Sequence, residues 1–501
     1  MSTDFSARPE LMMGPNPFIE ALPPYLTPED IARNFGNCPL DNKPWRELSP
    51  GLREPLLEFA AHHIAPTSSI LPAVIAIQTL IRRSMCQFNP LLPEERRRCN
   101  MIGMAPNMTT IRTTPRLNGA GATLAAMTGM GKTTGASRSL QLVAPNQVID
   151  HGSSTVYGWQ RLRQVTWLYV DHPSNGTRGA LLKRILSALD EALGTDFSDQ
   201  YARVSNIDTL LTQVCKQLSL HRVALLIIDE KQQRNFQDSP WSLEFVLFYL
   251  SLMNLGISVL LIGNPLAFDH LRAFSQVVRR FSVGGMHQLN PAITESEPWW
   301  CDDLVPRIHQ FSLVEHIEVD ANERKRFEFK HTAGIPGLLQ LLHVEAQRSA
   351  LRRATGTHAT LEMTDYQDAL ESPSYKEVAP LAQQILHRKT IKPLMADIPD
   401  SDEVGGSGAM DDFRIPEGAT VDVIKRMTKS HQATQTRELK KFQAMLESVS
   451  KLSPEEQQML GLKSDLLSAV KDAQARAGTG RRTGRRKPSG PPSEAKTADD
   501  R

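Results

Sequence analysis

The sequence predicts an α/β fold, in which a central parallel sheet is followed by a helical lid. A helical extension precedes these parts and a flexible tail follows them. Between Gly121 and about Asn290, four short apolar runs alternate with helical patterns, and the runs are 122–127, 166–170, 223–229 and 258–263. Runs that are apolar throughout are typical of strands covered on both faces, as in a parallel sheet. Helical periodicity lies on both sides of this segment, and residues 476–501 have no apolar stripe.

Periodicity and composition divide the chain of 501 residues into six expected segments. The stretches LREPLLEFAAHHIA and LPAVIAIQTLIRR predict amphipathic helices near the N-terminus, and these either cap the next domain or dock another protein. The stretch DIPDSDEVGGSGAMDD is typical of a linker. The segments are a helical partner-docking region 1–100, an αβ core 101–290, a helical lid 291–375, a linker 376–420, a helical region 421–475 and a disordered basic tail 476–501.

The composition excludes several classes of protein. Hydrophobic residues make up 40% of the chain and charged residues 22%, which excludes wholesale disorder. Five cysteines without a CxxC pair do not form a disulfide scaffold and indicate reduced thiols in the cytoplasm. No apolar run approaches the ~20 residues of a membrane span, and the start lacks the apolar core of a signal peptide. We therefore expect no membrane partner.

A phosphate-binding loop is predicted at 126–134, where the sequence reads AMTGMGKTT between a strand-like run and a helical pattern. Backbone N–H groups of such a loop hold phosphates, Lys132 reaches the β- and γ-phosphates, and Thr133 is a ligand for Mg²⁺. The usual pattern GxxxxGK[ST] has Gly where this chain has Ala126. The alternative is a chance glycine-rich turn. The expected nucleotide contacts are Thr128, Gly129, Met130, Gly131, Lys132, Thr133 and Thr134.

Two further strands end in polar residues that suit nucleotide hydrolysis. VALLIIDE ends in Asp229 and Glu230, and an acidic pair at this end of a strand holds the metal and polarises the attacking water. Asp229 is thus expected to bind nucleotide-bound Mg²⁺, and Glu230 to act as the general base. LLIGNP places Asn264 after the next strand, where its amide could bond the γ-phosphate or the water. The alternative for each is a solvated strand end.

Arg279 and Arg280 follow about 15 residues after this strand. A guanidinium suits a γ-phosphate, and such an arginine can serve the site of a neighbouring subunit. The alternative is an ordinary surface pair.

The order of these motifs resembles the AAA+ P-loop ATPases, and the details resemble one branch, the TnsC family. Members of that family are ATP-dependent regulators of Tn-seven-like DNA transposons, and TniB, IstB and MuB are more distant relatives. The resemblance covers roughly residues 15–370. It rests on the N-terminal NPFIEALPPYL, Asp171-x-Pro173, Gly176, Asp190, Gly194-Thr195, IIDEKQ with Gln232, LLIGNP, and TAGIPGLLQLLHVEAQRSA at 332–350.

The resemblance implies ATP and Mg²⁺ as cofactors, and a ring or helical filament of copies on double-stranded DNA in the bacterial cytoplasm. It implies that a target selector of TnsD or TniQ type signals to the chain, which then recruits transposase subunits of TnsA and TnsB type. By motif, Lys132 and Thr133 are the P-loop pair, Asp229 and Glu230 the acidic pair, Asn264 the sensor, and Arg280 rather than Arg279 the trans arginine. The GIPGLLQLL segment departs from many AAA+ lids because it has no arginine.

DNA contacts are the least specific expectation. Lys183 and Arg184 follow the second strand and are assigned to the inner face of an assembly, while the alternative is an exposed charged helix face. No base-reading motif is visible, so a partner would choose the sequence. The rival functions are a signalling or chaperone-like P-loop ATPase that acts on proteins without DNA assembly, and a scaffold that binds ATP and barely hydrolyses it.

Overall fold

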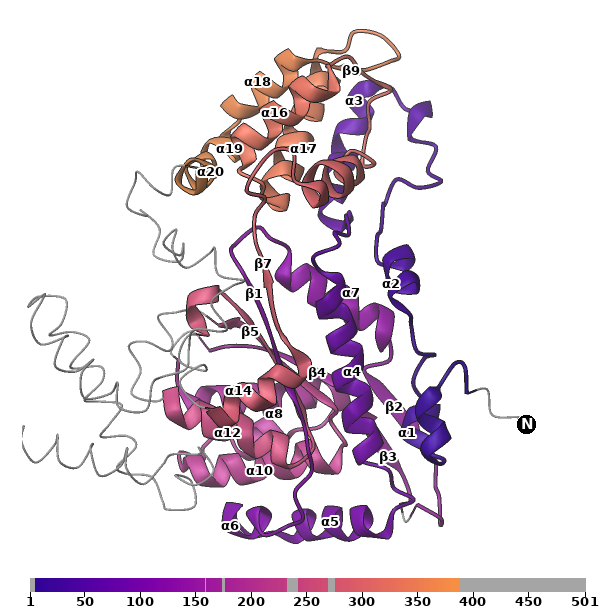
Figure 1. Cartoon of the computed structure of the whole chain (residues 1–501), viewed down its shortest axis with the longest axis vertical. Coiled ribbons are helices and arrows are strands. Elements are labelled where there is room, and N and C mark those ends of the chain that lie inside the picture. The colour runs from indigo at the N-terminus through magenta and orange to yellow at the C-terminus, as the bar shows by residue number, and fades with distance from the viewer. Residues whose placement is uncertain (1–4, 158, 174–175, 232–241, 269–274, 387–501) are drawn as a thin grey trace, which may run out of the picture.

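The computed structural model describes residues 5–157, 159–173, 176–231, 242–268 and 275–386 (Figure 1). The expected helical region 421–475 and basic tail 476–501 lie outside the described residues, as does most of the expected linker. The first residues of that linker belong to helix α20 (Ala379–Leu386). This helix forms because Ala382 and Ile385 are buried against the rest of the structure, so the helical part extends beyond the boundary expected from composition.

A five-stranded sheet in the order β4-β5-β6-β1-β7 forms the centre of the lower half in Figure 1. All four neighbouring pairs are parallel. Its strands are β1 (Gly121–Ala126), β4 (Trp167–Asp171), β5 (Leu225–Lys231), β6 (Ser258–Gly263) and β7 (Met286–Leu289). The four predicted apolar runs are β1, β4, β5 and β6, which confirms the predicted parallel sheet. The fifth strand was not predicted, because its sequence MHQL lies at the edge of the sheet and is only partly buried.

Helices cover both faces of this sheet, as a parallel sheet requires. They are α7 (Lys132–Val143), α8 (Arg178–Leu193), α9 (Phe197–Gln200), α10 (Ile207–Leu220), α12 (Ser242–Asn254) and α14 (Ser275–Gly284), with the short turn η4 (Pro265–Ala267). The ends of α8 show how the local sequence sets the bounds. The Thr177 side chain accepts a hydrogen bond from the N–H of Ala180, and Gly194 ends the helix in the left-handed conformation. An antiparallel hairpin of β2 (Val148–His151) and β3 (Leu162–Val165) flanks the sheet.

The lid is a separate helical layer at the top of Figure 1. It contains η5 (Trp299–Leu304), α15 (Val305–Ile308), α16 (Ala321–Thr332), α17 (Pro336–Arg353), α18 (Met363–Glu371) and α19 (Pro373–Lys376), followed by α20. The two-residue strands β8 (His316–Ile317) and β9 (Thr360–Leu361) pair in parallel. The lid has its own apolar core, which includes Leu342, Tyr366 and Tyr375.

The N-terminal region packs on both the sheet and the lid. Its elements are η1 (Pro9–Met13), α1 (Pro17–Glu20), α2 (Pro28–Asn34), η2 (Trp45–Glu47), α3 (Pro50–Arg53), η3 (Glu54–His62), α4 (Leu71–Gln87), α5 (Pro93–Met104) and α6 (Met108–Arg112). Helix α4 lies against α7 and β6, and its Ser84 hydroxyl bonds that of Ser258 at 2.9 Å. This packing corresponds to the cap interpretation of the first hundred residues, while docking of a partner stays a prediction.

Residues 37–63 leave the sheet and join the lid. Leu40, Trp45 and Leu57 belong to the apolar core of the lid. Arg53 is fully buried there, pairs with Glu315 at 2.6 Å and donates to the backbone carbonyl of Leu313 at 3.2 Å. The N-terminal region therefore connects the two layers of the molecule. Within the described residues, no helix is both long enough and apolar enough to cross a membrane.

Candidate nucleotide site

The predicted phosphate-binding loop joins β1 to α7 and has an open backbone. Gly129 and Gly131 have φ of 84° and 78°, a left-handed conformation that glycine adopts without strain. The side chain of Met130 between them is buried and anchors the loop, while Thr128, Thr133 and Thr134 are exposed. Helix α7 begins at Lys132 directly after Gly131, and no side chain caps its first turn. The N–H groups of that turn are therefore placed to bind an anion.

Thr133 and Asp229 meet directly below this loop. The Thr133 hydroxyl donates to Oδ2 of Asp229 at 2.8 Å, although the two residues are 96 positions apart. Asp229 is buried at the end of β5, and its backbone carbonyl accepts the N–H of His172 at 2.8 Å. The two side chains that the sequence predicts as Mg²⁺ ligands are therefore in direct contact.

Tyr169 is a third member of this group, which the sequence did not reveal. It lies on β4 beside β5, and its hydroxyl donates to the same Oδ2 of Asp229. Burial, and after it the hydrogen bond to Asp229, raises the pKa of Tyr169 far above its usual value. The phenol therefore stays protonated and donates throughout the physiological range. Together, Tyr169 and Thr133 fix the orientation of the carboxylate.

The other predicted residues follow from the strand order. Strand β6 lies between β5 and β1, so Asn264 at its end is placed between the acidic strand and the phosphate-binding loop. Asn264 is buried. Glu230 follows Asp229 within β5, where the register with β6 shifts between Ile228 and Lys231. All the predicted polar strand ends thus lie at the carboxyl edge of one sheet, where open α/β folds bind ligands.

Mg²⁺ fits the oxygen ligands that this site offers. A hydroxyl and a carboxylate are hard donors, and Mg²⁺ in nucleotide sites takes one or two protein oxygens together with phosphate oxygens and waters. Within the described part of the chain, no group of three or more His, Cys, Asp or Glu side chains could hold a metal by itself. Thr133 and Asp229 would therefore hold the ion as part of a nucleotide complex.

The lid touches the phosphate-binding loop. The N–H of Gly337, in the first turn of α17, donates to the carbonyl of Gly129 at 2.9 Å. A methyl group on Gly129 would lie 2.8 Å from Cγ2 of Ile335, and one on Gly337 would lie 3.0 Å from the Gly129 carbonyl oxygen. Glycine at both positions therefore permits the close approach. The segment GIPG was visible in the sequence as part of a resemblance, but nothing local to it indicated this contact.

The two candidate trans arginines have different environments. Both lie on α14, where Val277 and Phe281 face the core. Arg279 is exposed, whereas Arg280 is half-buried and donates to the Asn254 side chain at 2.7 Å. Both residues lie on the same helix, but only Arg279 is exposed to solvent.

Lys183 and Arg184 lie on α8 and bind carbonyl groups of this chain. Lys183 donates to the Ala202 carbonyl at 2.7 Å, and Arg184 donates to the Asp171 carbonyl at 3.1 Å. Arg184 is exposed, so its charge remains accessible. A DNA contact by either residue stays a prediction.

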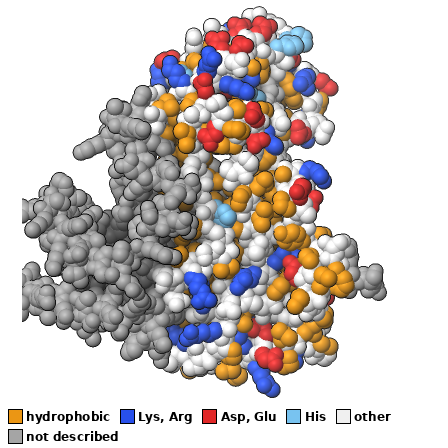
Figure 2. Space-filling model, in the orientation of Figure 1, with side chains coloured by type: hydrophobic (Ala, Val, Ile, Leu, Met, Phe, Trp, Pro, Cys, Tyr) orange, Lys and Arg blue, Asp and Glu red, His pale blue; other side chains and the backbone are white. Residues whose placement is uncertain are grey.

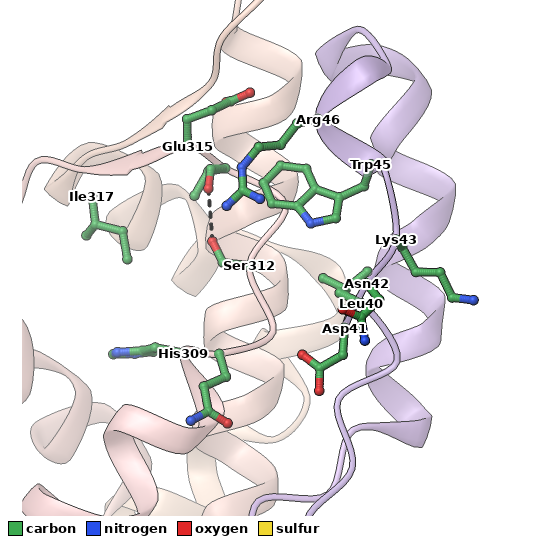
Figure 3. Close-up of a pocket in the computed structure, with 12 residues that line it drawn as sticks. Leu40, Asp41, Asn42, Lys43, Trp45, Arg46, His309, Ser312, Glu315 and Ile317 are labelled. Carbon is green, nitrogen blue, oxygen red and sulfur yellow. Dashed lines mark hydrogen bonds between the residues drawn. The ribbon is translucent and has the colours of Figure 1, made fainter.

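A cavity of about 500 Å³ lies at the junction between the N-terminal region and the lid. Residues 40–46 line one side, and lid residues between His309 and Ile317 line the other (Figure 3). None of the lining residues belongs to the phosphate-binding loop, to β5 or to the end of β6. The cavity is therefore separate from the nucleotide site.

The chain has the AAA+ P-loop fold, and this defines its class. The family described as AAA domain matches residues 119–271, which include the loop, the acidic strand and Asn264. Comparison with the curated proteins finds no match.

Solved structures with the same kind of fold include Cdc6p from Pyrobaculum aerophilum, at 12% identity and TM-score 0.35, covering 56% of this chain and 67% of that one. The Orc1 protein of Aeropyrum pernix in complex with DNA has 17% identity and TM-score 0.33, covering 74% and 87%. A Walker-type ATPase of Pyrococcus abyssi has 14% identity and TM-score 0.32, covering 59% and 76%.

Proposed function

We propose that this protein is a Mg²⁺-dependent ATPase that assembles on duplex DNA and links a target selector of TnsD or TniQ type to transposase subunits of TnsA and TnsB type. The contact between Thr133 and Asp229 under an open phosphate-binding loop is the observation that carries the nucleotide part. The TnsC-like motifs carry the transposition part. ATP hydrolysis would then disassemble the oligomer on the DNA.

The residues divide the chemistry as follows. Bound Mg²⁺ supplies charge neutralisation at the β- and γ-phosphates. The loop N–H groups and Lys132 bind the phosphates, and Thr133 and Asp229 hold the ion. Glu230 accepts a proton from the attacking water, which Asn264 orients toward the γ-phosphate. An arginine of α14, Arg279 or Arg280, stabilises the developing charge in the site of a neighbouring copy.

Tyr169 is a positioning residue in this scheme. It acts through Asp229, because its hydroxyl shares Oδ2 with Thr133. Tyr169→Phe keeps the ring and removes the donor. We therefore expect Mg²⁺ to bind more weakly, so that half-maximal turnover needs a higher Mg²⁺ concentration, before ATP binding itself is lost. The Mg²⁺ concentration for half-maximal turnover measures this, and an unchanged value would remove Tyr169 from the site.

The lid gives a way to couple nucleotide state to assembly. Because Gly337 bonds Gly129, a phosphate that moves the loop also moves the first turn of α17. The N-terminal segment is packed on the same lid. A movement of the lid would therefore also move the N-terminal surface that is proposed to meet the target selector. In this proposal the contact between Gly337 and Gly129 couples the lid to the nucleotide, a role left open because the GIPGLLQLL segment has no arginine.

Sedimentation and negative-stain microscopy with duplex DNA test the proposal. Filaments or rings are expected with DNA plus ATP or a non-hydrolysable analogue, and not with ADP. Lys132→Ala is the control that lacks the phosphate ligand. Nucleotide binding without DNA-dependent assembly, at low salt as well as high, would instead favour an ATPase that acts on proteins. Glu230→Gln tests hydrolysis, because it is expected to keep assembly and to lower turnover by about 100-fold or more.

A further inference from the structure

A cluster of buried charges lies where helix α5 packs against the end of helix α10, in the lower part of Figure 1. Glu95 and Arg98 belong to α5, and Arg222 follows α10 by two residues. Figure 2 shows Lys and Arg side chains at the surface of the lower part of the molecule, where water solvates them. By contrast, Glu95, Arg98 and Arg222 are only 4%, 2% and 5% exposed. Charges buried this deeply need counter-charges inside the protein.

The charges of this cluster do not balance. Nε and Nη2 of Arg98 donate to the two carboxylate oxygens of Glu95 at 2.6 and 2.8 Å, so these side chains form a bidentate pair. Nη1 of Arg222 lies 3.9 Å from Oε1 of the same carboxylate. Neither arginine forms an ion pair with a second carboxylate within the described residues. Two guanidinium groups therefore share one carboxylate, and one positive charge is left over.

The surrounding segments supply no further negative charge. Residues 96–149, which include the rest of α5 and all of α6, contain no Asp or Glu. Glu94 at the start of α5 is exposed, and Asp208 lies at the opposite end of α10. The other charged residues close to this end of α10 and on α6, Lys216 and Arg112, are cations. No carboxylate of these segments therefore compensates the excess positive charge.

Three hydrogen-bond donors in the cluster are unused. Arg222 donates through Nη1 to the backbone carbonyl of Ser219 at 3.0 Å and to Sγ of Cys99. In the part of the chain that the structure describes, however, Nη1 of Arg98, Nε of Arg222 and the hydroxyl of Ser219 are buried without a hydrogen-bond partner. A buried donor without an acceptor costs free energy, and native proteins rarely leave several of them together. An acceptor that carries negative charge would both satisfy the donors and compensate the charge.

The backbone shows that the chain has an arginine at position 222 against its conformational preference. Arg222 has φ of 51°, and helix ends of this left-handed kind usually have Gly or Asn. Its N–H donates to the carbonyl of Ser219 at 3.2 Å, and that of Val223 donates to the carbonyl of Leu218 at 2.9 Å, so this turn ends α10. A glycine would end the helix at a lower cost. The guanidinium group, rather than the backbone, therefore explains the arginine.

We propose that this cluster is a binding site for a small inorganic anion, and that chloride is its physiological ligand. Arg98, Arg222 and Ser219 are the donors of the site. A buried water accepts hydrogen bonds but leaves the excess charge in place, whereas a monovalent anion also compensates it. The depth of the cluster favours chloride over larger oxyanions.

The bound ion would join two parts of the core. Helix α5 precedes β1 and the phosphate-binding loop, and Arg222 lies three residues before β5, which carries Asp229. An anion bound by both segments stabilises their packing, because it binds the folded chain and not the unfolded one. This role does not depend on the proposed ATPase function.

Thermal unfolding of the full-length protein without nucleotide tests the proposal. Sodium chloride is exchanged stepwise for sodium gluconate at one ionic strength, so that screening of surface charges stays constant. Gluconate is too large for a buried site. The unfolding midpoint is expected to rise by about 2–4 °C with chloride and then to level off, as for saturation of one site. A midpoint that is the same at every chloride concentration overturns the inference.

Three variants locate the site. Arg222→Asn removes the excess charge, suits the positive φ and leaves the pair of Arg98 and Glu95 intact, so its midpoint should not depend on chloride. Ser219→Ala removes one donor and should raise the half-saturating chloride concentration several-fold, and it decides alone if Arg222→Asn does not fold. Arg97→Gln is the matched control, because Arg97 is exposed on α5, and it should keep the whole chloride effect. If Arg222→Asn or Ser219→Ala behaves like Arg97→Gln, chloride binds elsewhere and the inference is wrong.

Chloride-35 magnetic resonance measures binding directly, since exchange with a protein site broadens the signal of the free ion. The broadening should be larger for the wild type than for Arg222→Asn at equal concentration. Equal broadening would show an adventitious ion only and overturn the inference. The thiol of Cys99 is the competing source of negative charge, and Cys99→Ser should keep the chloride effect. A wild type that is insensitive to chloride, with a loss of stability in Cys99→Ser, would assign the counter-charge to the thiol and overturn the inference.

Discussion

Arginines have opposite environments at two places in the molecule, the helical lid with the N-terminal segment packed on it and one part of the surface of the core. Where the N-terminal segment meets the lid, they are paired: Arg53 with Glu315 at 2.6 Å and Arg352 with Glu54 at 2.5 Å. Within the lid, Arg353 pairs with Asp365 at 2.7 Å. On the surface of the core, Arg116 and Arg279 are exposed and form no ion pair within the described residues. Paired arginines close an internal junction, whereas unpaired ones leave their charge for another molecule. The paired arginines therefore stabilise the fold, whereas the exposed, unpaired ones are available to bind another molecule.

The largest expected effect is a loss of stability when the buried pair of Arg53 and Glu315 is broken. Arg53→Ala leaves the mostly buried Glu315 carboxylate without its counter-ion, and breaking a buried pair costs about 3–5 kcal/mol. Chemical denaturation measures the loss in the free energy of unfolding. The control is Arg352→Ala, whose side chain is mostly exposed, and its loss should stay below about 1 kcal/mol. Equal losses would show that burial does not distinguish the two pairs.

The next largest effect is expected at the contact between Gly337 of the lid and Gly129 of the phosphate-binding loop. Gly337→Ala places a methyl group 3.0 Å from the Gly129 carbonyl oxygen, so the lid and the phosphate-binding loop must move apart. We expect a loss of about 1–3 kcal/mol in stability together with weaker ATP binding. Gly356→Ala is the matched control in the lid, because no atom lies within 4 Å of its added methyl group. If both variants bind ATP alike, the contact does not transmit the nucleotide state.

A third prediction concerns pH and a buried histidine of the lid. Burial, and after it the charges of His309 and Arg324, lowers the pKa of His343 well below its ordinary 6.5. In the unfolded chain this histidine binds a proton below about pH 6.5, so the folded state loses up to about 1.4 kcal/mol per pH unit as the pH falls toward the folded pKa. Above pH 6.5 the histidine is neutral in both states, so the folded state keeps its full stability there.

Thermal unfolding at pH 7.5 and 5.5 measures that dependence. His343→Gln can still donate to the Phe311 carbonyl, which His343 contacts at 3.2 Å, but it does not titrate. The difference between the two pH values should therefore shrink in the variant. An unchanged difference would assign the acid sensitivity to other groups.

The smallest effect is expected at Arg116, on the surface of the core. Arg116→Gln removes a charge that has no partner in the described chain, so its stability should remain within about 0.5 kcal/mol of the wild type. Denaturant unfolding of the dilute protein without nucleotide gives this value. A loss near that of Arg53→Ala would show that Arg116 has an internal role, and the comparison between the two places would fail.

Local sequence was sufficient for the strands and the loop. The runs that became β1, β4, β5 and β6 are mostly apolar, and β1, β5 and β6 inside the sheet are buried on both faces, which permits few other structures. The glycines at 129 and 131 were identifiable because a phosphate-binding turn needs their positive φ. Asp229 was identifiable because it ends an apolar run. Strand β7 was not, since a short edge strand does not need that pattern.

The sequence by itself determined the class of fold, the loop and the chemistry available at the strand ends, because each of these depends on neighbouring residues or on burial. Only the tertiary structure decided which of these residues meet. Tyr169 reaches Asp229 from the next strand, Gly337 reaches Gly129 from the lid, and Arg280 of α14 reaches Asn254 of α12. These contacts join residues far apart in the chain. No local pattern marks them, because packing rather than propensity brings the segments together.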